Sequence, residues 1–196
     1  MQNLLGLSAW ESAIYILQAK HRITVQSWHF WSVKPQLIPA SPAEILNIRE
    51  LAVDIWHEYY PAIIGTEQVE YMLEKLYSEA ALLDQMHKGQ AFWLIRLEDI
   101  VCGFTAVSKE AEGRYFLNKF YIQQRSRAKG LGLSVFRELL NLYPDLQEMR
   151  LQVNRQNVVA INFYFKAGFV IEKSADFDIG DGYFMNDFVM VYKRKN

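Results

Sequence analysis

Residues 114–132 read RYFLNKFYIQQRSRAKGLG, an apolar strand pattern followed by a basic loop that contains two glycines. Gly130 and Gly132, one residue apart, allow the backbone to turn sharply and to bring several amide N–H groups close to a ligand. A helix pattern begins at this loop, and the N-terminus of a helix favours an anion. The stretch predicts a strand, a diphosphate-binding loop and a helix, with a plain turn as the alternative for a glycine pair alone.

Two other phosphate-binding motifs do not fit this loop. A Walker P-loop ends in Gly-Lys-Ser/Thr, whereas Gly132 is followed by Leu133 and Ser134. A dinucleotide fingerprint needs a third glycine and an early place in the chain, and both are missing.

Hydrophobic periodicity on either side of the loop predicts one mixed α/β (α+β) domain with a single sheet. A Ser41-Pro42-Ala43-Glu44 capping box opens the first helix, Thr66 caps the second, and Gly89 stops it. The expected helices are 41–60, 66–88, about 131–143 and 157–167; the expected strands are 91–97, 100–108, 114–122, 149–153, 169–173 and 183–192.

Residues 1–34 differ from the rest and are expected to form an N-terminal extension to a domain at 35–196. The extension combines apolar residues at helical spacing, from Trp10 to Leu17, with an aromatic cluster at 28–31. An extra helix and strand packed on the domain is one interpretation, and a homodimer contact is the alternative. The stretch has no basic residue before Lys20 and resembles no targeting signal, so we expect a cytoplasmic protein that does not enter a membrane.

Composition excludes several function classes. The chain has 196 residues, with 21 basic and 22 acidic side chains and a net charge of −1, a balance that argues against a nucleic-acid partner. Cys102 is the only cysteine, so an internal disulfide and a multi-cysteine metal site are excluded. His21, His29 and His87 show no metal-ligand spacing, and no metal is expected.

Three motifs together resemble the GNAT superfamily of acyl-CoA-dependent N-acetyltransferases. They are FLNKFYI (116–122), RAKGLG (127–132) and NVVAINFYFKAGF (157–169), in the family's order. The resemblance covers about residues 36–193 and does not reach the N-terminal extension. It implies the GNAT fold, in which a mixed central sheet is splayed at the cofactor cleft and flanked by helices.

The resemblance also implies a set of residues that bind acetyl-CoA as the cosubstrate. Backbone groups of the strand at 114–122 (the signature strand) would contact the pantetheine arm, and backbone amides of the loop at 127–132 (the glycine loop) would bind the pyrophosphate. Asn157 would reach the cofactor from the start of the last helix, although an N-cap explains it equally well. The implied set is Phe120, Tyr121, Ile122, Arg127, Ala128, Lys129, Gly130, Leu131, Gly132 and Asn157.

By the same resemblance Tyr164 would be the general acid that protonates the coenzyme A thiolate, which a phenol can do; a core tyrosine is the alternative. Trp56, Glu58 and Tyr59 fall in the region that shapes the acceptor pocket in the family. The identity of the general base is left open. Many members of the family carry histidine where this chain has Asn118, and an asparagine cannot take up a proton. His57 and Glu58, adjacent on the first helix, are therefore candidates, and Asp187 is a weaker one.

The sequence therefore predicts an N-acetyltransferase that moves an acetyl group from acetyl-CoA to a primary amine by direct attack in a ternary complex. The acceptor would be a small molecule, polyamine-like if the acidic early helices face it, or a peptide amine. Five acidic residues give that hint: Asp54, Glu58, Glu67, Glu70 and Glu74. The alternative is a non-catalytic acyl-CoA sensor or interaction module on the same scaffold, which Asn118 keeps open.

Overall fold

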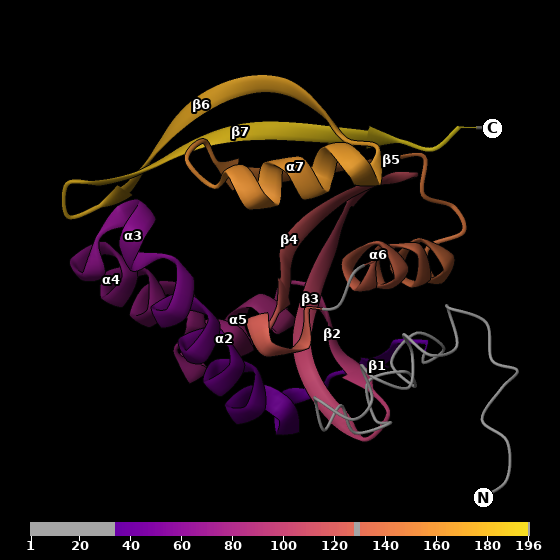
Figure 1. The fold of residues 1–196 in the computed structure, drawn as a ribbon, viewed down its shortest axis with the longest axis horizontal. Helices are drawn as coiled ribbons and strands as arrows, with labels where there is room; N and C mark the ends of the chain where they lie inside the picture. The colour runs from indigo at the N-terminus through magenta and orange to yellow at the C-terminus, as the bar shows by residue number, and fades with distance from the viewer. Residues whose placement is uncertain (1–33, 128–129, 196) are drawn as a thin grey trace, which may run out of the picture. The chain divides into compact units, whose positions relative to one another are not determined.

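The structure, a computed structural model, describes residues 34–127 and 130–195. The expectations for residues 1–33, and for Ala128 and Lys129, lie outside the described residues. Within the described ranges the chain forms a mixed α/β fold around one seven-stranded sheet of order β1-β2-β3-β4-β5-β7-β6 (Figure 1). Neighbouring strands run antiparallel except for β4 and β5, which are parallel. The predicted fold class is confirmed.

The first half of the sheet carries four helices on one face. After β1 (Gln36–Pro39) come a 3-10 turn η2 (Pro42–Glu44), α2 (Ile45–Tyr59), α3 (Pro61–Ile64), α4 (Thr66–Tyr77) and α5 (Glu79–His87), and then the strands β2 (Ala91–Leu97), β3 (Ile100–Ala111) and β4 (Arg114–Ile122). Buried residues of α2, α4 and α5 pack with those of β2 and β3 in one core cluster.

The second half carries the remaining helices on the opposite face. A 3-10 turn η3 (Gln124–Ser126) leads through the glycine loop to α6 (Leu131–Leu142), followed by β5 (Glu148–Asn154), α7 (Val158–Ala167), β6 (Val170–Gly180) and β7 (Tyr183–Lys193). Apolar residues of α6 and α7 pack against β5 and β7 in a second cluster. The long β6–β7 hairpin reaches α4, where Gln68 Nε2 donates to the Phe184 carbonyl at 2.8 Å.

The helix at 66–88 was expected to be continuous, but the structure divides it at Ser78. Ser78 is extended (φ −60°, ψ 154°), so α4 ends at Tyr77 and α5 begins at Glu79. The apolar stripe runs through both helices, which is why periodicity alone does not reveal the break. The capping box is also only half formed: Ser41 Oγ accepts from the Ala43 amide at 3.3 Å, whereas Glu44 accepts from Asn47.

Candidate active site

The strands β4 and β5 separate after a short parallel contact. They pair only from Arg114–Phe116 to Glu148–Arg150. Across β4, Lys119 pairs with Ala106 of β3 and Leu117 pairs with Val107, so Asn118 is the extra residue of a β-bulge. The bulge bends β4 away from β5 and leaves one strand edge without a backbone partner, which is the splayed arrangement expected from the sequence.

A cavity of about 850 Å³ lies at this separation. Side chains of α2, α4 and α5 line it from one side of the sheet, and the start of α6 and α7 line it from the other. It brings together eleven of the residues that the sequence assigns to cofactor binding, acceptor binding or acid catalysis: Trp56, Tyr59, Phe120, Tyr121, Ile122, Arg127, Gly130, Leu131, Gly132, Asn157 and Tyr164. Glu58 is exposed and is not part of the lining.

The glycine loop forms the N-terminus of α6. Gly130 is the N-cap with φ +86°, a conformation that side chains disfavour, and a Cβ built on it would meet nothing within 4 Å. The first helical hydrogen bond runs from the Ser134 amide to the Gly130 carbonyl at 3.0 Å. The amides before Ser134 therefore have no acceptor within the helix, and they lie at the cavity, where they can bind an anion.

Gly132 serves packing rather than backbone conformation. A Cβ built on it would lie 2.8 Å from Cε2 of Phe163 on α7, a distance that real side chains do not tolerate. Phe163 in turn stacks on Phe120 of β4, with ring centroids 5.4 Å apart. The absence of a side chain at Gly132 thus lets α6, α7 and β4 meet at the cavity wall.

Arg127 is held between β4 and α2. Its Nε donates to the Ile122 carbonyl at 2.9 Å, and its guanidinium lies 5.7 Å from the ring centroid of Tyr59. This arrangement places a permanent positive charge beside the α6 N-terminus.

Asn157 is the N-cap of α7. Its Oδ1 accepts from the Ala160 amide at 3.0 Å and from the Tyr59 hydroxyl at 3.1 Å. The capping interpretation is confirmed, and these bonds leave Nδ2 for a ligand. Asn157 and Arg127 both contact Tyr59, so Tyr59 connects α2 to each of them.

Tyr164 projects from α7 among aromatic rings. It packs against Phe163 and Phe169, with centroids 5.2 and 5.5 Å away, and only 9% of it is exposed. Burial raises the pKa of its phenol far above the ordinary value of 10.0, so the hydroxyl stays protonated over the whole physiological range. Tyr164 is therefore available as an O–H donor in the cavity.

The other wall near Tyr164 is also rich in tyrosine. Tyr77 donates to the Tyr121 hydroxyl at 3.1 Å. Burial raises the pKa of Tyr121 well above 10.0, and the nearby Tyr77 and Tyr164 raise it further. Trp56 stacks on Tyr60 with centroids 4.3 Å apart. These rings form a neutral wall that contributes hydroxyl groups but no charge.

Asp187 supplies the one carboxylate among the described residues that line the cavity. It lies on β7 opposite Asn154 of β5 and is 6% exposed. Burial raises its pKa to about 6, while Arg155 opposes the shift. At neutral pH it is ionised and can accept a proton, so the weakest base candidate from the sequence is the one that lies in the cavity.

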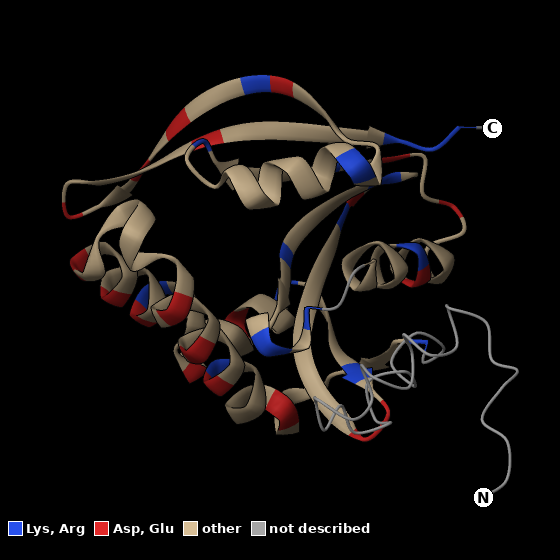
Figure 2. Cartoon of the chain, in the orientation of Figure 1, with Lys and Arg blue, Asp and Glu red and all other residues tan. Residues whose placement is uncertain are grey.

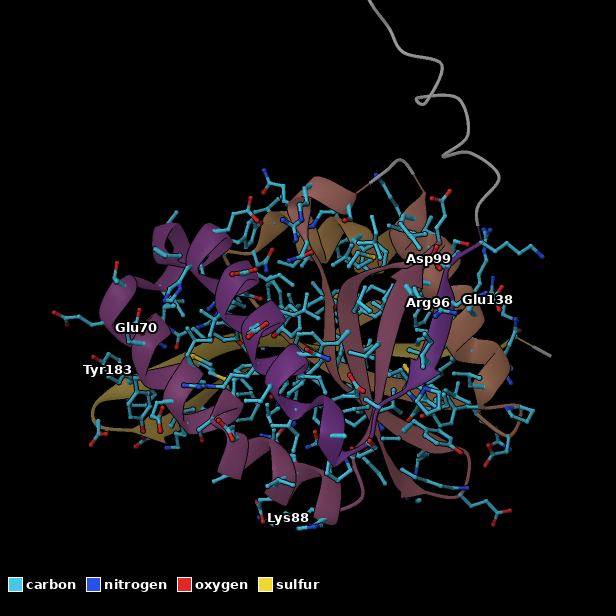
Figure 3. The ribbon with its side chains drawn as sticks, turned by 90° about the horizontal axis from the view of Figure 1, so that it is seen from below. Glu70, Lys88, Arg96, Asp99, Glu138 and Tyr183 are labelled. Carbon is cyan, nitrogen blue, oxygen red and sulfur yellow. The ribbon has the colours of Figure 1, made fainter. Side chains whose placement is uncertain are left out.

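The other base candidates lie outside it. His57 and Glu58 are both exposed on α2, and His57 Nε2 pairs with Glu70 Oε1 of α4 at 2.6 Å. Figure 2 shows acidic residues on the outer surfaces of α2, α4 and α5, and Figure 3 places Glu70 at the edge of this helical layer. All five acidic residues that suggested a cationic acceptor are exposed, and none lines the cavity: Asp54, Glu58, Glu67, Glu70 and Glu74.

Sequence reasoning missed several polar residues of the cavity, among them Lys119 and Gln85. Lys119 interrupts an otherwise apolar strand, a signal that it is either exposed or functional. Gln85 carried no such signal, because its place depends on the break at Ser78. No cluster of three potential metal-ligating side chains occurs in 34–127 and 130–195. In the same ranges no helix is long and apolar enough to cross a bilayer.

Comparison with solved structures identifies the same architecture in other proteins. The PaiA N-acetyltransferase from Thermoplasma acidophilum, solved in complex with coenzyme A, superposes with a TM-score of 0.68 at 24% identity, covering 82% of this chain and 99% of that one. The Ard1 structure from Thermoplasma volcanium gives a TM-score of 0.64 at 24% identity, covering 84% of this chain and 100% of that one.

Sequence comparison extends the likeness from fold to family. The spermidine N(1)-acetyltransferase of Thermoplasma acidophilum is 27% identical over 157 residues, which cover 76% of this chain and 91% of that protein. The profile of the Acetyltransferase (GNAT) family matches residues 49–169, from α2 to the end of α7. The chain therefore belongs to the GNAT family and is an acetyltransferase.

Proposed function

We propose that the protein transfers the acetyl group of acetyl-CoA to a primary amine, and that both substrates occupy the cavity between β4 and β5 at the same time. One observation carries the proposal: a helix N-terminus with free amides, a protonated phenol and an ionisable carboxylate all line this one cavity. The amine-acetylating relative from Thermoplasma acidophilum supports the reaction class.

The residues present suit acetyl-CoA. The free amides at Leu131, Gly132 and Leu133, together with Arg127, supply the donors and the charge that a pyrophosphate needs. The space above Gly130 is open, so a phosphate can approach the backbone there. The unpaired edge of β4 after Phe116 offers backbone groups to the amide bonds of a pantetheine arm.

The chemical step needs one acid and one base. The amine nitrogen attacks the thioester carbonyl carbon, the C–S bond breaks, and the departing thiolate takes the proton of the Tyr164 hydroxyl. The proton lost by the amine goes to Asp187, which is ionised at neutral pH. As free coenzyme A leaves, Asp187 releases its proton to solvent and Tyr164 takes one up, so both groups return to their starting states.

A cysteine acyl-enzyme receives no support. Cys102 is 1% exposed and its Sγ lies 3.5 Å from the Ile95 carbonyl, away from the cavity lining. Burial raises the pKa of its thiol, so the thiolate is disfavoured. Direct attack by the amine is the route that the side chains of the cavity favour.

Two measurements test the proposal. Saturating acetyl-CoA at one hundred times Kd should raise the unfolding midpoint by roughly 5–10 °C, since linkage adds about 2.7 kcal/mol. Free thiol should then be released from acetyl-CoA only when an amine acceptor is present. A midpoint shift without release by any amine would favour the acyl-CoA sensor, and no shift at all would exclude the cofactor site.

A further inference from the structure

The cavity contains a buried lysine that the acetyl-transfer step does not use. Lys119 follows the bulge of β4 and is 7% exposed, with its ammonium on the α4–α5 side of the sheet. Its Nζ donates to Gln85 Oε1 at 2.6 Å and lies 5.1 Å from the ring centroid of Tyr77 and 5.6 Å from that of Phe92. A lysine in such surroundings needs an explanation, because burying an ammonium is costly.

No carboxylate among the described residues forms an ion pair with Lys119. Its hydrogen bond is to a neutral amide, and its remaining neighbours are aromatic rings. Burial lowers the pKa of the ammonium to about 8, so most of it still carries a proton at pH 7. The site is therefore a positive charge without a counter-ion at the wall of a cavity.

A second buried donor lies in the same cavity. The indole Nε1 of Trp56 makes no hydrogen bond of good geometry among the described residues, although its N–H lies close enough to the Tyr77 hydroxyl to oppose the rise in the pKa of that phenol. The Trp56 ring lies 5.4 Å from that of Tyr77, so Trp56 and Lys119 contact the same tyrosine. The amide oxygen of Gln90 is buried without a donor as well, and it can accept an N–H or O–H of a ligand. An indole N–H and an ammonium suit an anion.

The charges that line the cavity do not fit a polycation. Lys119, Arg127 and Lys166 are basic, and Asp187 is the single acidic residue among the described lining residues. Arg127 beside the α6 N-terminus and Lys166 in the last turn of α7 are exposed, whereas Lys119 is buried and faces α4 and α5. The buried charges among the described lining residues are therefore one cation, Lys119, and one carboxylate, Asp187, which fits a molecule that carries both charges.

We infer that the acceptor is an amino carboxylate, whose carboxylate binds Lys119 and Trp56 while its amine faces Asp187 and Tyr164. This inference rests on the proposed acetyl transfer and narrows its substrate class. The two ends of the site are linked through aromatic residues: Lys119 lies over Tyr77, which donates to Tyr121, and Tyr164 lies close enough to Tyr121 to raise its pKa. The carboxylate and the amine are thus expected several bonds apart.

The test compares matched acceptors with the full-length protein. Thiol release from acetyl-CoA is measured with ω-amino carboxylates of one to five methylene groups, with the carboxamide of each, and with diamines of the same lengths and spermidine. We expect kcat/KM for the best carboxylate to exceed that of its carboxamide and of the matching diamine at least tenfold. The chain length of that best substrate then measures the separation of the two subsites.

Variants locate the preference at Lys119. Lys119→Met should raise KM for the carboxylate at least tenfold and bring the carboxylate-to-carboxamide ratio of kcat/KM close to one, with diamine turnover retained. Lys88→Met is the matched control, because Lys88 pairs with Asp84 on the outer end of α5 (Figure 3) and is not part of the cavity lining. If Lys119→Met does not fold, Lys119→Gln provides the same comparison.

Each outcome decides a different statement. A wild-type protein that prefers diamines or spermidine over every carboxylate overturns the amino-carboxylate inference and leaves acetyl transfer standing. A Lys119→Met variant that loses activity equally with all acceptors also overturns it, since a purely structural role predicts that result. Failure of every amine, despite a thermal shift with acetyl-CoA, overturns the proposed function together with the inference.

Discussion

Gln85 Nε2 donates a hydrogen bond to the Leu76 carbonyl at 2.8 Å, across the break between α4 and α5. In a continuous helix this carbonyl would accept from the amide four residues later, but the extended Ser78 prevents that bond. The bond fixes the Gln85 amide so that Oε1 accepts from Lys119 at 2.6 Å. The helix break therefore supplies the hydrogen-bond acceptor of the buried lysine.

Lys119→Met should make the fold more stable at neutral pH. The substitution removes a buried charge without a counter-ion and leaves Gln85 without its donor, and the balance should be a gain of roughly 1–3 kcal/mol. The folded pKa of about 8 lies below the ordinary 10.5, so between these values only the unfolded state keeps the proton and wild-type stability rises with pH.

Urea unfolding at pH 7 and pH 10 checks this prediction. The stability difference between Lys119→Met and wild type should be largest below pH 8 and should shrink toward pH 10.5. A variant that is less stable than wild type at pH 7 would show that the lysine contributes to the fold and was not retained for a ligand.

The preference for a carboxylate over its carboxamide should weaken above pH 8, as Lys119 loses its proton. Gln85, Tyr77 and Phe92 face its ammonium from α5, α4 and β2, and Tyr121 lies beside it on β4. Burial raises the pKa of both tyrosines, so neither becomes charged in this range. The ratio of kcat/KM for the two acceptors isolates this titration once each value is divided by the free-amine fraction of that acceptor, because the carboxylate and the carboxamide give their amines different pKa values.

Tyr164→Phe should lower kcat by a factor of about 10² or more while Kd for acetyl-CoA stays within twofold, since only the proton donor is removed. Tyr183→Phe is the control, because Tyr183 packs on Tyr71 at the β6–β7 hairpin and is not among the residues that line the cavity. Single-turnover thiol release and equilibrium binding separate the two effects. Unchanged kcat would remove Tyr164 from the acid role.

Asp187→Asn should reduce kcat/KM by about 10² or more and abolish its decline below pH 6, because the wild-type decline reports protonation of this base. The folded pKa of about 6 exceeds the ordinary 3.8, so the folded state holds a proton that the unfolded state releases between these values. Wild-type stability therefore falls as pH rises through that range.

Above pH 6 the full cost of the buried charge is present, and Asp187→Asn should be more stable than wild type by roughly 1–3 kcal/mol. Asp99→Asn, in the β2–β3 hairpin (Figure 3), is the surface control and should change neither kcat/KM nor the free energy of unfolding. An Asp187→Asn variant with a wild-type pH profile would assign the base elsewhere.

The two glycines of the loop should fail in different ways when each is replaced by alanine. Gly130→Ala forces a side chain into φ +86° without a clash, so it should distort the α6 N-terminus and weaken acetyl-CoA binding about tenfold at modest cost in stability. Gly132→Ala places Cβ against Phe163 and should lower stability by about 1–3 kcal/mol. Calorimetric binding and thermal unfolding of both variants distinguish conformation from packing.

Most of the fold could be predicted from the sequence, because its elements carry strong local signals. The strand pattern of 114–122, the glycine loop and the helix ending at Gly168 each follow a period or a cap that the structure confirms. Ser78 was missed because an extended residue between two amphipathic helices does not disturb their common stripe. The short β1 was missed because four residues beside prolines carry too little pattern.

The cavity lining contains most of the residues that the sequence named for the cofactor and fewer of those that it named for the acceptor and the base. Loop and cap motifs are local, so the glycine pair and the Asn157 cap could be found from the sequence, and the family resemblance added their expected role toward the cofactor. Acceptor residues come from α2, α5, β4 and β7, and their meeting depends on the bulge at Asn118 and on the break at Ser78. Glu58 and Asp187 show the difference: the first is on the expected helix but faces outward, and the second was ranked low but is buried in the cavity.

The short contact between β4 and β5 has a consequence for how the protein unfolds. Only three residue pairs, from Arg114–Phe116 to Glu148–Arg150, join β4 to β5, whereas β3 pairs with β4 at eight positions and β5 pairs with β7 at seven. Because so few backbone pairs hold this joint, we expect it to open at a lower free energy than the pairings within either half of the sheet. The catalytic cavity would then be complete only while the two halves are docked, and partial unfolding at the joint would abolish activity while each half keeps its secondary structure.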